Sequence, residues 1–171
     1  MHQARSGGFT LIELMVALAV AAVLLTLGLP SFQASLRSNR LATANNELIA
    51  SIAMARSEAM RSNRGAGLCA TSDGASCGAD WNAGWLVWGD DNRNGALDAG
   101  EIVTRHVQGH PALNLVTESG VASIAFSARG TANAAQEFVM QPTTCPAGLE
   151  LVNTLKMNGS GQVTTSKSTC E

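Results

Sequence analysis

The sequence predicts an α+β fold in which a long N-terminal helix packs on an antiparallel β-sheet domain. Three observations carry this prediction. An apolar segment occupies residues 9–29, an apolar stripe with helical spacing continues beyond it, and short segments punctuated by Gly, Asn, Asp and Pro follow from Gly65 onward. The first two patterns are typical of one helix whose surroundings change along its length, and the third is typical of β-strands.

The composition excludes several classes of protein. Of the 171 residues, 46% are hydrophobic and only 14% are charged, with a net charge of −2. Disorder, a coiled-coil rod and a multi-span membrane protein do not fit this balance, and nonspecific binding to phosphate backbones gains no support from it. The four cysteines show no C-x-x-C spacing, so two disulfides in an oxidising compartment are expected rather than a zinc module.

The apolar segment Phe9–Leu29 is interrupted only by Thr10, Glu13 and Thr26. At about 1.5 Å per residue it reaches roughly 30 Å, the thickness of a bilayer core, so the first half of the helix is predicted to span a membrane. A cleaved secretory signal and a plain signal anchor are the alternatives. The exit from the segment, residues 28–32 (Gly-Leu-Pro-Ser-Phe), is a poor signal-peptidase site.

Glu13 distinguishes this segment from an ordinary anchor. A carboxylate near the centre of a bilayer costs on the order of 2.5–3.5 kcal/mol by insertion scales. The Glu13 carboxylate is therefore expected either to remain hydrated at the membrane interface or to pair with a cation from another chain.

The segment Gly7-Gly8-Phe9-Thr10-Leu11-Ile12-Glu13-Leu14 resembles the leader and N-terminus of type IV pilins and pseudopilins. The resemblance implies that prepilin peptidase cleaves after Gly8 and that the new N-terminal residue, Phe9, is N-methylated. It also implies that Glu13 pairs with the free amine of a neighbouring subunit during assembly. Pro30 stands where pilins commonly carry a Pro that kinks the helix.

The apolar stripe predicts that the helix continues to about Asn63 and ends at a glycine cap, Arg64-Gly65. The stripe consists of Phe32, Leu36, Leu41, Ala44, Leu48, Ile52, Ala55 and Ala59. The expected organisation is a leader at 1–8, a transmembrane and filament-core helix at 9–30, an amphipathic continuation at 31–64 and a β-rich globular domain at 65–171. A bend is expected near Pro30, because its ring removes an N–H and clashes with the preceding turn.

Six short segments are strand candidates, and together they predict one or two antiparallel sheets. They are Trp85–Trp88, Ile102–Val107, Leu113–Val116, Ala122–Ser127, Glu137–Gln141 and Leu149–Met157. Within the first, alternation places Trp85 and Val87 on one face and Leu86 and Trp88 on the other.

The segments Trp81–Trp88, Asp90–Gly95 and Gly100–Val103 resemble the W-x-x-G-W, D-x-N-x-N-G and G-E pattern of minor pilins of the GspH/FimT type. These are low-abundance subunits of type II secretion pseudopili and type IV pili. The resemblance implies a pilin-like fold and a subunit that is structural rather than enzymatic.

The same loop matches the spacing of a calcium-binding template, in which alternate side chains converge on one centre and a glycine permits the sharp turn. The matching residues are Asp90, Asn92, Asn94, Gly95, Asp98 and Glu101. The flanks have the pattern of strands rather than helices, and any long hairpin turn uses Asn, Asp and Gly. A structural turn and no cofactor is the preferred interpretation, with calcium as the alternative.

Four cysteines permit three pairings. We predict Cys69–Cys77 and Cys145–Cys170, because each closes one loop and the second fastens a C-terminal tail that otherwise frays. A bond between Cys69 and Cys170 would contradict this choice.

The remaining polar residues suggest no catalytic site. His106 and His110 have a spacing that binds metal on a helix, but Gly109 and Pro111 make a helix there implausible. No nucleophile–base pattern or phosphate-binding loop occurs in the sequence.

Some FimT-type pilins bind DNA through a C-terminal G-R-x-R motif. The corresponding segment of this chain is residues 161–164, and only Gly161 matches the motif. Gln162 and Thr164 replace the two arginines, and Lys156 and Lys167 are isolated. DNA is therefore not expected as a partner.

The sequence thus predicts a minor pilin or pseudopilin of the bacterial inner membrane, with its C-terminal domain in the periplasm, which then enters a pilus or pseudopilus. The expected partners are other pilins or pseudopilins, prepilin peptidase and the inner-membrane assembly platform. The rival functions are a DNA-binding pilin for natural transformation and a calcium-dependent adhesin on a membrane stalk.

Overall fold

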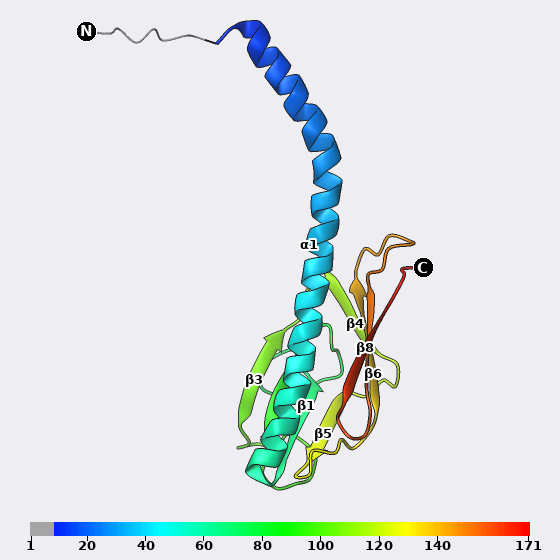
Figure 1. Cartoon of the computed structure of the whole chain (residues 1–171). Helices are drawn as coiled ribbons and strands as arrows, with labels where there is room; N and C mark the ends of the chain where they lie inside the picture. The colour runs from blue at the N-terminus through cyan, green and yellow to red at the C-terminus, as the bar shows by residue number, and fades with distance from the viewer. Residues whose placement is uncertain (1–8) are drawn as a thin grey trace, which may run out of the picture. The chain divides into compact units, whose positions relative to one another are not determined.

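The computed structural model describes residues 9–171, apart from the side chains at positions 27, 30 and 31. The predicted leader, including Gly8, lies outside the described residues. The chain divides into two compact units, residues 1–38 and residues 39–171. One long helix, α1 (Leu11–Ser62), contributes to both of them (Figure 1).

α1 confirms the predicted long helix, with its first residue two positions later than expected. The helix includes position 30, and the bend expected there stays a prediction. Its C-terminal boundary differs from the predicted glycine cap. Asn63 takes the left-handed conformation with φ 53°, whereas Gly65 already begins a strand. Asparagine tolerates this conformation better than most residues, so it ends the helix.

The predicted stripe is buried only where α1 belongs to the second unit. Its last six members, from Leu41 to Ala59, are at most 3% exposed, whereas Phe32 is 62% and Leu36 38% exposed. Phe32 and Leu36 lie on α1 as the stripe predicts, but they are not buried within this chain. Both precede Asn39, where the second unit begins.

Eight strands form two four-stranded antiparallel sheets. They are β1 (Gly65–Ala70), β2 (Gly84–Asp90), β3 (Val103–Gln108), β4 (Leu113–Thr117), β5 (Ser123–Ser127), β6 (Gln136–Pro142), β7 (Val152–Met157) and β8 (Val163–Ser168). The strand order is β3-β2-β1-β5 in one sheet and β4-β6-β7-β8 in the other. All six predicted strands are present, but the prediction missed β1 and β8 and began β7 three residues too early.

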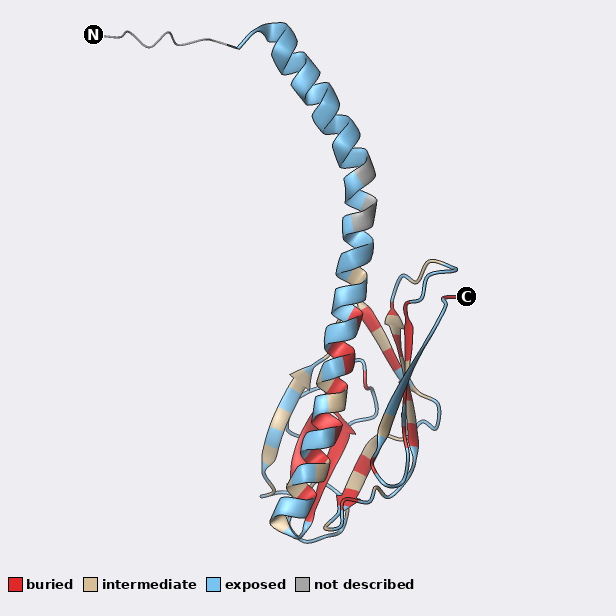
Figure 2. Cartoon of the chain, viewed as in Figure 1, coloured by how far each residue is buried: buried red, intermediate tan, exposed pale blue. Residues whose placement is uncertain are grey.

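A single core joins the last part of α1 to both sheets. Leu48 and Ile52 of α1, Trp85 of β2, Phe126 of β5 and Phe138 of β6 belong to the same buried cluster. Figure 1 shows this part of α1 lying across the sheet that contains β1, and in Figure 2 buried residues, in red, alternate with exposed ones along it. The buried apolar surface supplies the main favourable term for folding of this unit.

β2 separates two apolar clusters, as its alternation predicts. Trp85 and Val87 face the core, whereas Leu86 and Trp88 form an outer cluster with Cys69, covered by Leu97 and Val103. Gly67 of β1 leaves room for the Trp88 indole, because a Cβ at position 67 would lie 2.2 Å from two atoms of that ring. The loop that contains Leu97 thus has a packing role in addition to any polar one.

Candidate functional site

The first turn of α1 presents the residues that the pilin resemblance singles out. The backbone N–H of Glu13 donates a hydrogen bond to Oγ1 of Thr10 at 3.2 Å, so Thr10 is the N-cap of the helix. Thr10-x-x-Glu13 has the spacing of a capping box, a local signal in the sequence that marks the start of the helix after Thr10. Within residues 9–171 the Glu13 carboxylate has no hydrogen-bond or ion-pair partner.

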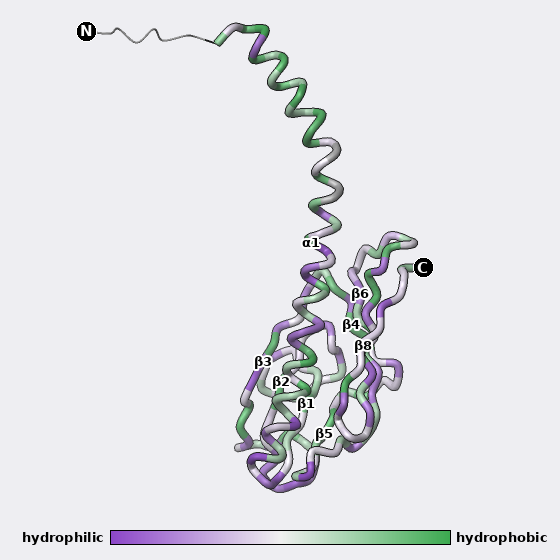
Figure 3. The backbone as a smooth tube through the Cα atoms, viewed as in Figure 1, coloured by the Kyte–Doolittle hydropathy of each residue, from purple (hydrophilic) through white to green (hydrophobic). Residues whose placement is uncertain are grey.

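The rest of this N-terminal segment is apolar and exposed all round. Phe9 is 85% exposed, and the eleven other described large apolar side chains up to Leu29 are each more than half exposed. Figure 3 shows this half of α1 largely in green, the colour of hydrophobic residues, and Figure 2 shows it mostly in the pale blue of exposed residues. Glu13 is the only ionisable side chain between Phe9 and Leu36.

Within the described residues, no helix has both the length and the hydropathy needed to cross a membrane.

Both predicted disulfides are confirmed. Cys69 of β1 bonds to Cys77 across a separation of eight residues, and Cys145 bonds to Cys170 across 25. The second bond fastens the tail after β8 to the β6–β7 connection. No free cysteine is found in the described part of the chain, so thiol chemistry has no candidate there.

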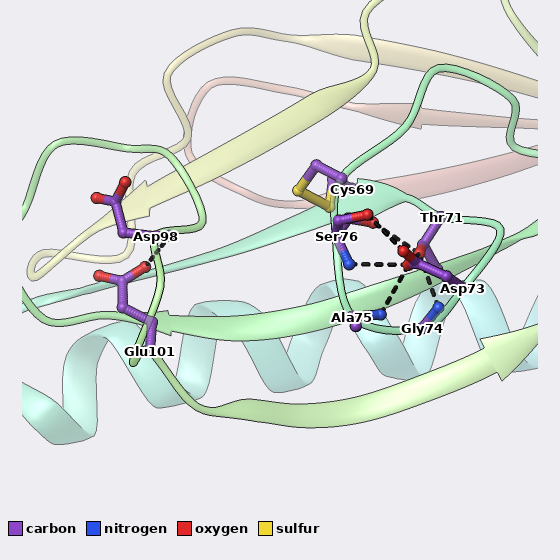
Figure 4. Close-up of a disulfide and its surroundings, with 9 residues drawn as sticks. Cys69, Thr71, Asp73, Gly74, Ala75, Ser76, Asp98 and Glu101 are labelled. Atoms are coloured by element: carbon purple, nitrogen blue, oxygen red, sulfur yellow. Dashed lines mark hydrogen bonds between the residues drawn. A yellow bond between two sulfur atoms is a disulfide. The ribbon is translucent and has the colours of Figure 1, made fainter.

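The loop closed by the first disulfide is organised around Asp73. Its Oδ1 accepts hydrogen bonds from the backbone N–H of Ala75 and Ser76 and from the Thr71 hydroxyl, and its Oδ2 accepts one from the Ser76 hydroxyl. These donors, led by the Ser76 hydroxyl, lower the pKa of Asp73 far below its usual range. Figure 4 shows the side chain enclosed by its own turn, beside the disulfide.

The Asp90–Glu101 loop uses its acidic oxygens internally. Both Asp90 oxygens accept backbone N–H groups, from Asn94 at 3.1 Å and from Gly95 at 2.9 Å. The two Glu101 oxygens accept the N–H groups of Asp91 and Asp98, each within 2.9 Å.

Asp98 completes this pattern. Its Oδ2 accepts the amide N–H groups of Asn92 and Asn94, which lower the pKa of the carboxyl. Figure 4 places Asp98 and Glu101 apart from the Asp73 turn. No group of three or more His, Cys, Asp or Glu side chains arranged to hold a metal occurs among the residues described. The geometry is that of a hairpin loop stabilised by its own side chains.

The segment that aligns with the DNA-binding motif lines a cleft of about 400 Å³ at the ends of β6, β7 and β8. Gln162 and Thr164 lie on its wall with Glu118. Lys156, also on the wall, is held by Glu137, with Nζ and Oε2 2.8 Å apart. This carboxylate raises the pKa of Lys156 and neutralises its charge. The cleft therefore offers no free cation among the residues that line it.

The two histidines are not brought together into a metal site. His106 lies on β3 against the backbone of Gly74. Nε2 of His110 lies 2.8 Å from Oε2 of Glu47, so this imidazole links the β3–β4 turn to α1.

A long N-terminal helix with an apolar, solvent-exposed first half and a disulfide-bonded β-domain defines a pilin-like subunit. The chain matches the prokaryotic N-terminal methylation motif over residues 3–29. It matches the family described as type II transport protein GspH over residues 44–163, more than half its length. The chain belongs to the GspH family and is a minor pilin or pseudopilin.

Individual relatives agree with this class. The chain is 38% identical to the pilin-like protein PilA1 of Thermus thermophilus over 96 residues, which are 55% of this chain and 54% of that protein. The match thus spans about half the length of this curated relative.

Among solved structures, the type IV minor pilin FimU of Pseudomonas aeruginosa superposes with a TM-score of 0.57 at 25% identity. The match covers 75% of this chain and 89% of FimU. A second crystal form of FimU gives 0.55 at 24% identity, covering 73% and 91%, and supports the α+β pilin fold.

Proposed function

We propose that the mature chain begins at Phe9 and serves as a structural subunit of a type IV pilus or a type II secretion pseudopilus. Prepilin peptidase removes residues 1–8, and the apolar first half of α1 holds the subunit in the inner membrane, with its β-domain in the periplasm. The assembly platform then transfers it into a filament of other pilins. The observation that carries this proposal is one carboxylate, Glu13, in the first turn of an exposed apolar helix.

The physical argument concerns what changes when this helix leaves the membrane. Exchanging lipid for neighbouring helices leaves the hydrophobic contribution nearly constant, so packing and polar pairing decide the register. An unpaired carboxylate in apolar surroundings is costly, whereas one paired with a neighbour's Phe9 ammonium is compensated. Glu13 therefore favours the axial position at which it meets a free amine.

Replacement of Glu13 tests this mechanism. We expect Glu13→Ala to be processed normally but to reach sheared filaments in amounts reduced by roughly tenfold, the equivalent of about 1.4 kcal/mol. N-terminal sequencing reports cleavage, and immunoblots of filament and membrane fractions report assembly. Glu150→Ala, which removes an exposed carboxylate of the β-domain, is the control and should assemble normally.

Normal incorporation of Glu13→Ala would contradict the pairing mechanism. A mature chain that still begins at Met1, or that begins beyond Pro30, would contradict the whole proposal. Loss of surface pili on deletion of the chain would assign it to a pilus, and loss of protein secretion would assign it to a pseudopilus.

The alternative of a DNA-binding pilin gains nothing from the motif position, where Gln162 and Thr164 carry no charge and Lys156 is paired with Glu137. Phosphate binding needs several unneutralised cations. We therefore keep the structural role as the proposed function.

A further inference from the structure

A second cleft lies at the C-terminal end of α1. Its volume is about 620 Å³, within the range of about 300–1,000 Å³ that is common for ligand pockets. Three segments far apart in the sequence form it: the α1–β1 junction, the β2–β3 loop and the β5–β6 connection. Each contributes one arginine, namely Arg64, Arg93 and Arg129, and we call this site the arginine cleft.

The three guanidinium groups differ in how far they are already engaged. Nη1 of Arg64 lies 2.7 Å from Oδ1 of Asp91, so its charge is neutralised locally. Nη2 of Arg93 donates to the carbonyl oxygen of Asn63 at 2.9 Å, which fixes the side chain against the end of α1 and leaves four N–H donors over. The Arg129 guanidinium has no hydrogen-bond or ion-pair partner in the described chain.

The turn that carries Arg129 is held firmly. The N–H of Gly130 donates to the carbonyl oxygen of Ser127 at 2.8 Å, and the hydroxyls of Ser127 and Thr131 lie 2.6 Å apart. Gly130 is buried against α1 with φ 75°, and a Cβ there would lie 2.8 Å from Sδ of Met60. A group bound by Arg129 therefore meets a turn that is already ordered, which reduces the entropy lost on binding.

The charge balance of the cleft limits what it can bind. Asp90 is 4% exposed and directs both oxygens to backbone N–H groups, and Asp91 is occupied by Arg64. Against these two carboxylates the three arginines leave one positive charge in excess. A nucleic acid backbone, which gains affinity from many neutralised phosphates, would find little here, whereas a single carboxylate would be matched.

The lining of the cleft is not wholly polar. Ala125 and Ala132, which are both partly exposed, contribute apolar atoms to the lining. This combination suits a peptide segment in which an acidic side chain stands next to an apolar one, since the carboxylate would meet the Arg93 and Arg129 forks while its neighbour covers the apolar wall.

We propose that the arginine cleft is a docking site for an acidic, partly apolar segment of a neighbouring protein subunit. Charge complementarity favours this occupant, because the cleft carries one positive charge in excess, and a second copy or relative of this chain, which has 13 Asp and Glu against 11 Lys and Arg, would supply carboxylates. The inference takes its neighbour from the proposed function, but binding at the cleft involves neither Phe9 nor Glu13.

The test uses the full chain in a neutral detergent and a fluorescein-labelled peptide, Gly-Phe-Asp-Glu-Leu-Gly, followed by fluorescence anisotropy. The same labelled peptide with Asn and Gln in place of Asp and Glu is the control, since it differs only in lacking the two side-chain carboxylates. We expect the acidic peptide to bind at least about tenfold more tightly than this amide control. Arg129→Ala should weaken that binding about tenfold, and Arg129→Glu should weaken it further.

Arg129 is the informative position because its guanidinium makes no hydrogen bond or ion pair within the described chain. Arg93→Ala is expected to weaken binding similarly, and thermal melting checks that neither variant is unfolded. Arg40→Ala, which removes an exposed arginine of α1 outside the cleft, is the matched control and should bind like the unmodified chain.

Equal affinity for the two peptides, or unchanged affinity in folded Arg129→Ala, would overturn the proposal. A labelled 20-nucleotide single strand that binds more tightly than the peptide and is lost in Arg129→Ala would also overturn it, by assigning the cleft to nucleic acid. Since these measurements need no filament, failure of the cleft and failure of Glu13-dependent assembly are distinguishable.

Discussion

Replacing Gly67 by alanine tests how tightly the outer cluster is packed against β1. An ideal Cβ at position 67 would lie 2.2 Å from Cη2 and Cζ2 of Trp88 and 2.7 Å from Cε2. Ordinary carbon contacts are about 3.5–4.0 Å, so the indole must move by more than about 1 Å. Trp88 is fully buried and lies next to Leu86 and Cys69, which leaves little space for that movement.

Overpacking of this kind typically costs about 1–3 kcal/mol. For a β-domain of this size the loss corresponds to a fall in Tm of roughly 3–10 °C. Gly89→Ala on β2 is the matched control, because no atom lies within 4 Å of its ideal Cβ. Differential scanning fluorimetry of the two variants under non-reducing conditions measures the contrast.

A double variant identifies the clash as the cause. Gly67→Ala combined with Trp88→Leu should lose less stability than the sum of the two single changes, since the smaller side chain leaves space for the methyl group. If Gly67→Ala melts within about 1 °C of the unmodified chain, or if Gly89→Ala is equally destabilised, the packing argument is wrong.

Two further predictions concern the polar loops. Asp73→Asn should lower Tm at pH 7, because four hydrogen bonds to the carboxylate hold the pKa of Asp73 below its value in the unfolded chain. A carboxyl whose pKa is lower in the folded chain stabilises the fold at pH values above its unfolded pKa of about 3.9, and this stabilisation is lost as the pH falls below that value. The difference in Tm between the unmodified chain and Asp73→Asn should therefore narrow below pH 4. A difference that stays constant from pH 7 to pH 3 would refute this cause. Calcium should not raise Tm and EDTA should not lower it, since the oxygens of Asp90, Asp98 and Glu101 already accept hydrogen bonds within their loop; calorimetric heat on calcium addition, lost in Asp98→Asn, would restore the calcium hypothesis.

The sequence alone determined those features that depend on neighbours along the chain. The long helix follows from the apolar segment and from the spacing between Leu41 and Ala59, because helical periodicity is a local signal. The two faces of β2 follow from alternation in the same way. The family followed from the segment around Gly8 and Glu13 and from the tryptophan pattern, and the disulfides from the loops that they close.

The tertiary structure decided what depends on distant segments. β1, with the sequence Gly-Ala-Gly-Leu-Cys-Ala, has too little side-chain volume to show a strand pattern. It nevertheless lies between β2 and β5, where Gly67 leaves the space that the Trp88 indole fills. β8 is polar because it is an exposed edge strand, so no apolar alternation marks it. The positions of β1 and β8 depend on neighbouring strands that are distant in the sequence, so the β-propensity of their own residues does not predict them.

The same reason separates the two candidate sites. Glu13 is found from the sequence because everything that defines it lies within one helical turn and the apolar run around it. The arginine cleft cannot be found from the sequence, since Arg64, Arg93 and Arg129 are separated by 29 and 36 residues and converge only after β1 pairs with both β2 and β5. Pairing of strands across such distances is set by the packing of the whole core, which no single segment of the sequence encodes.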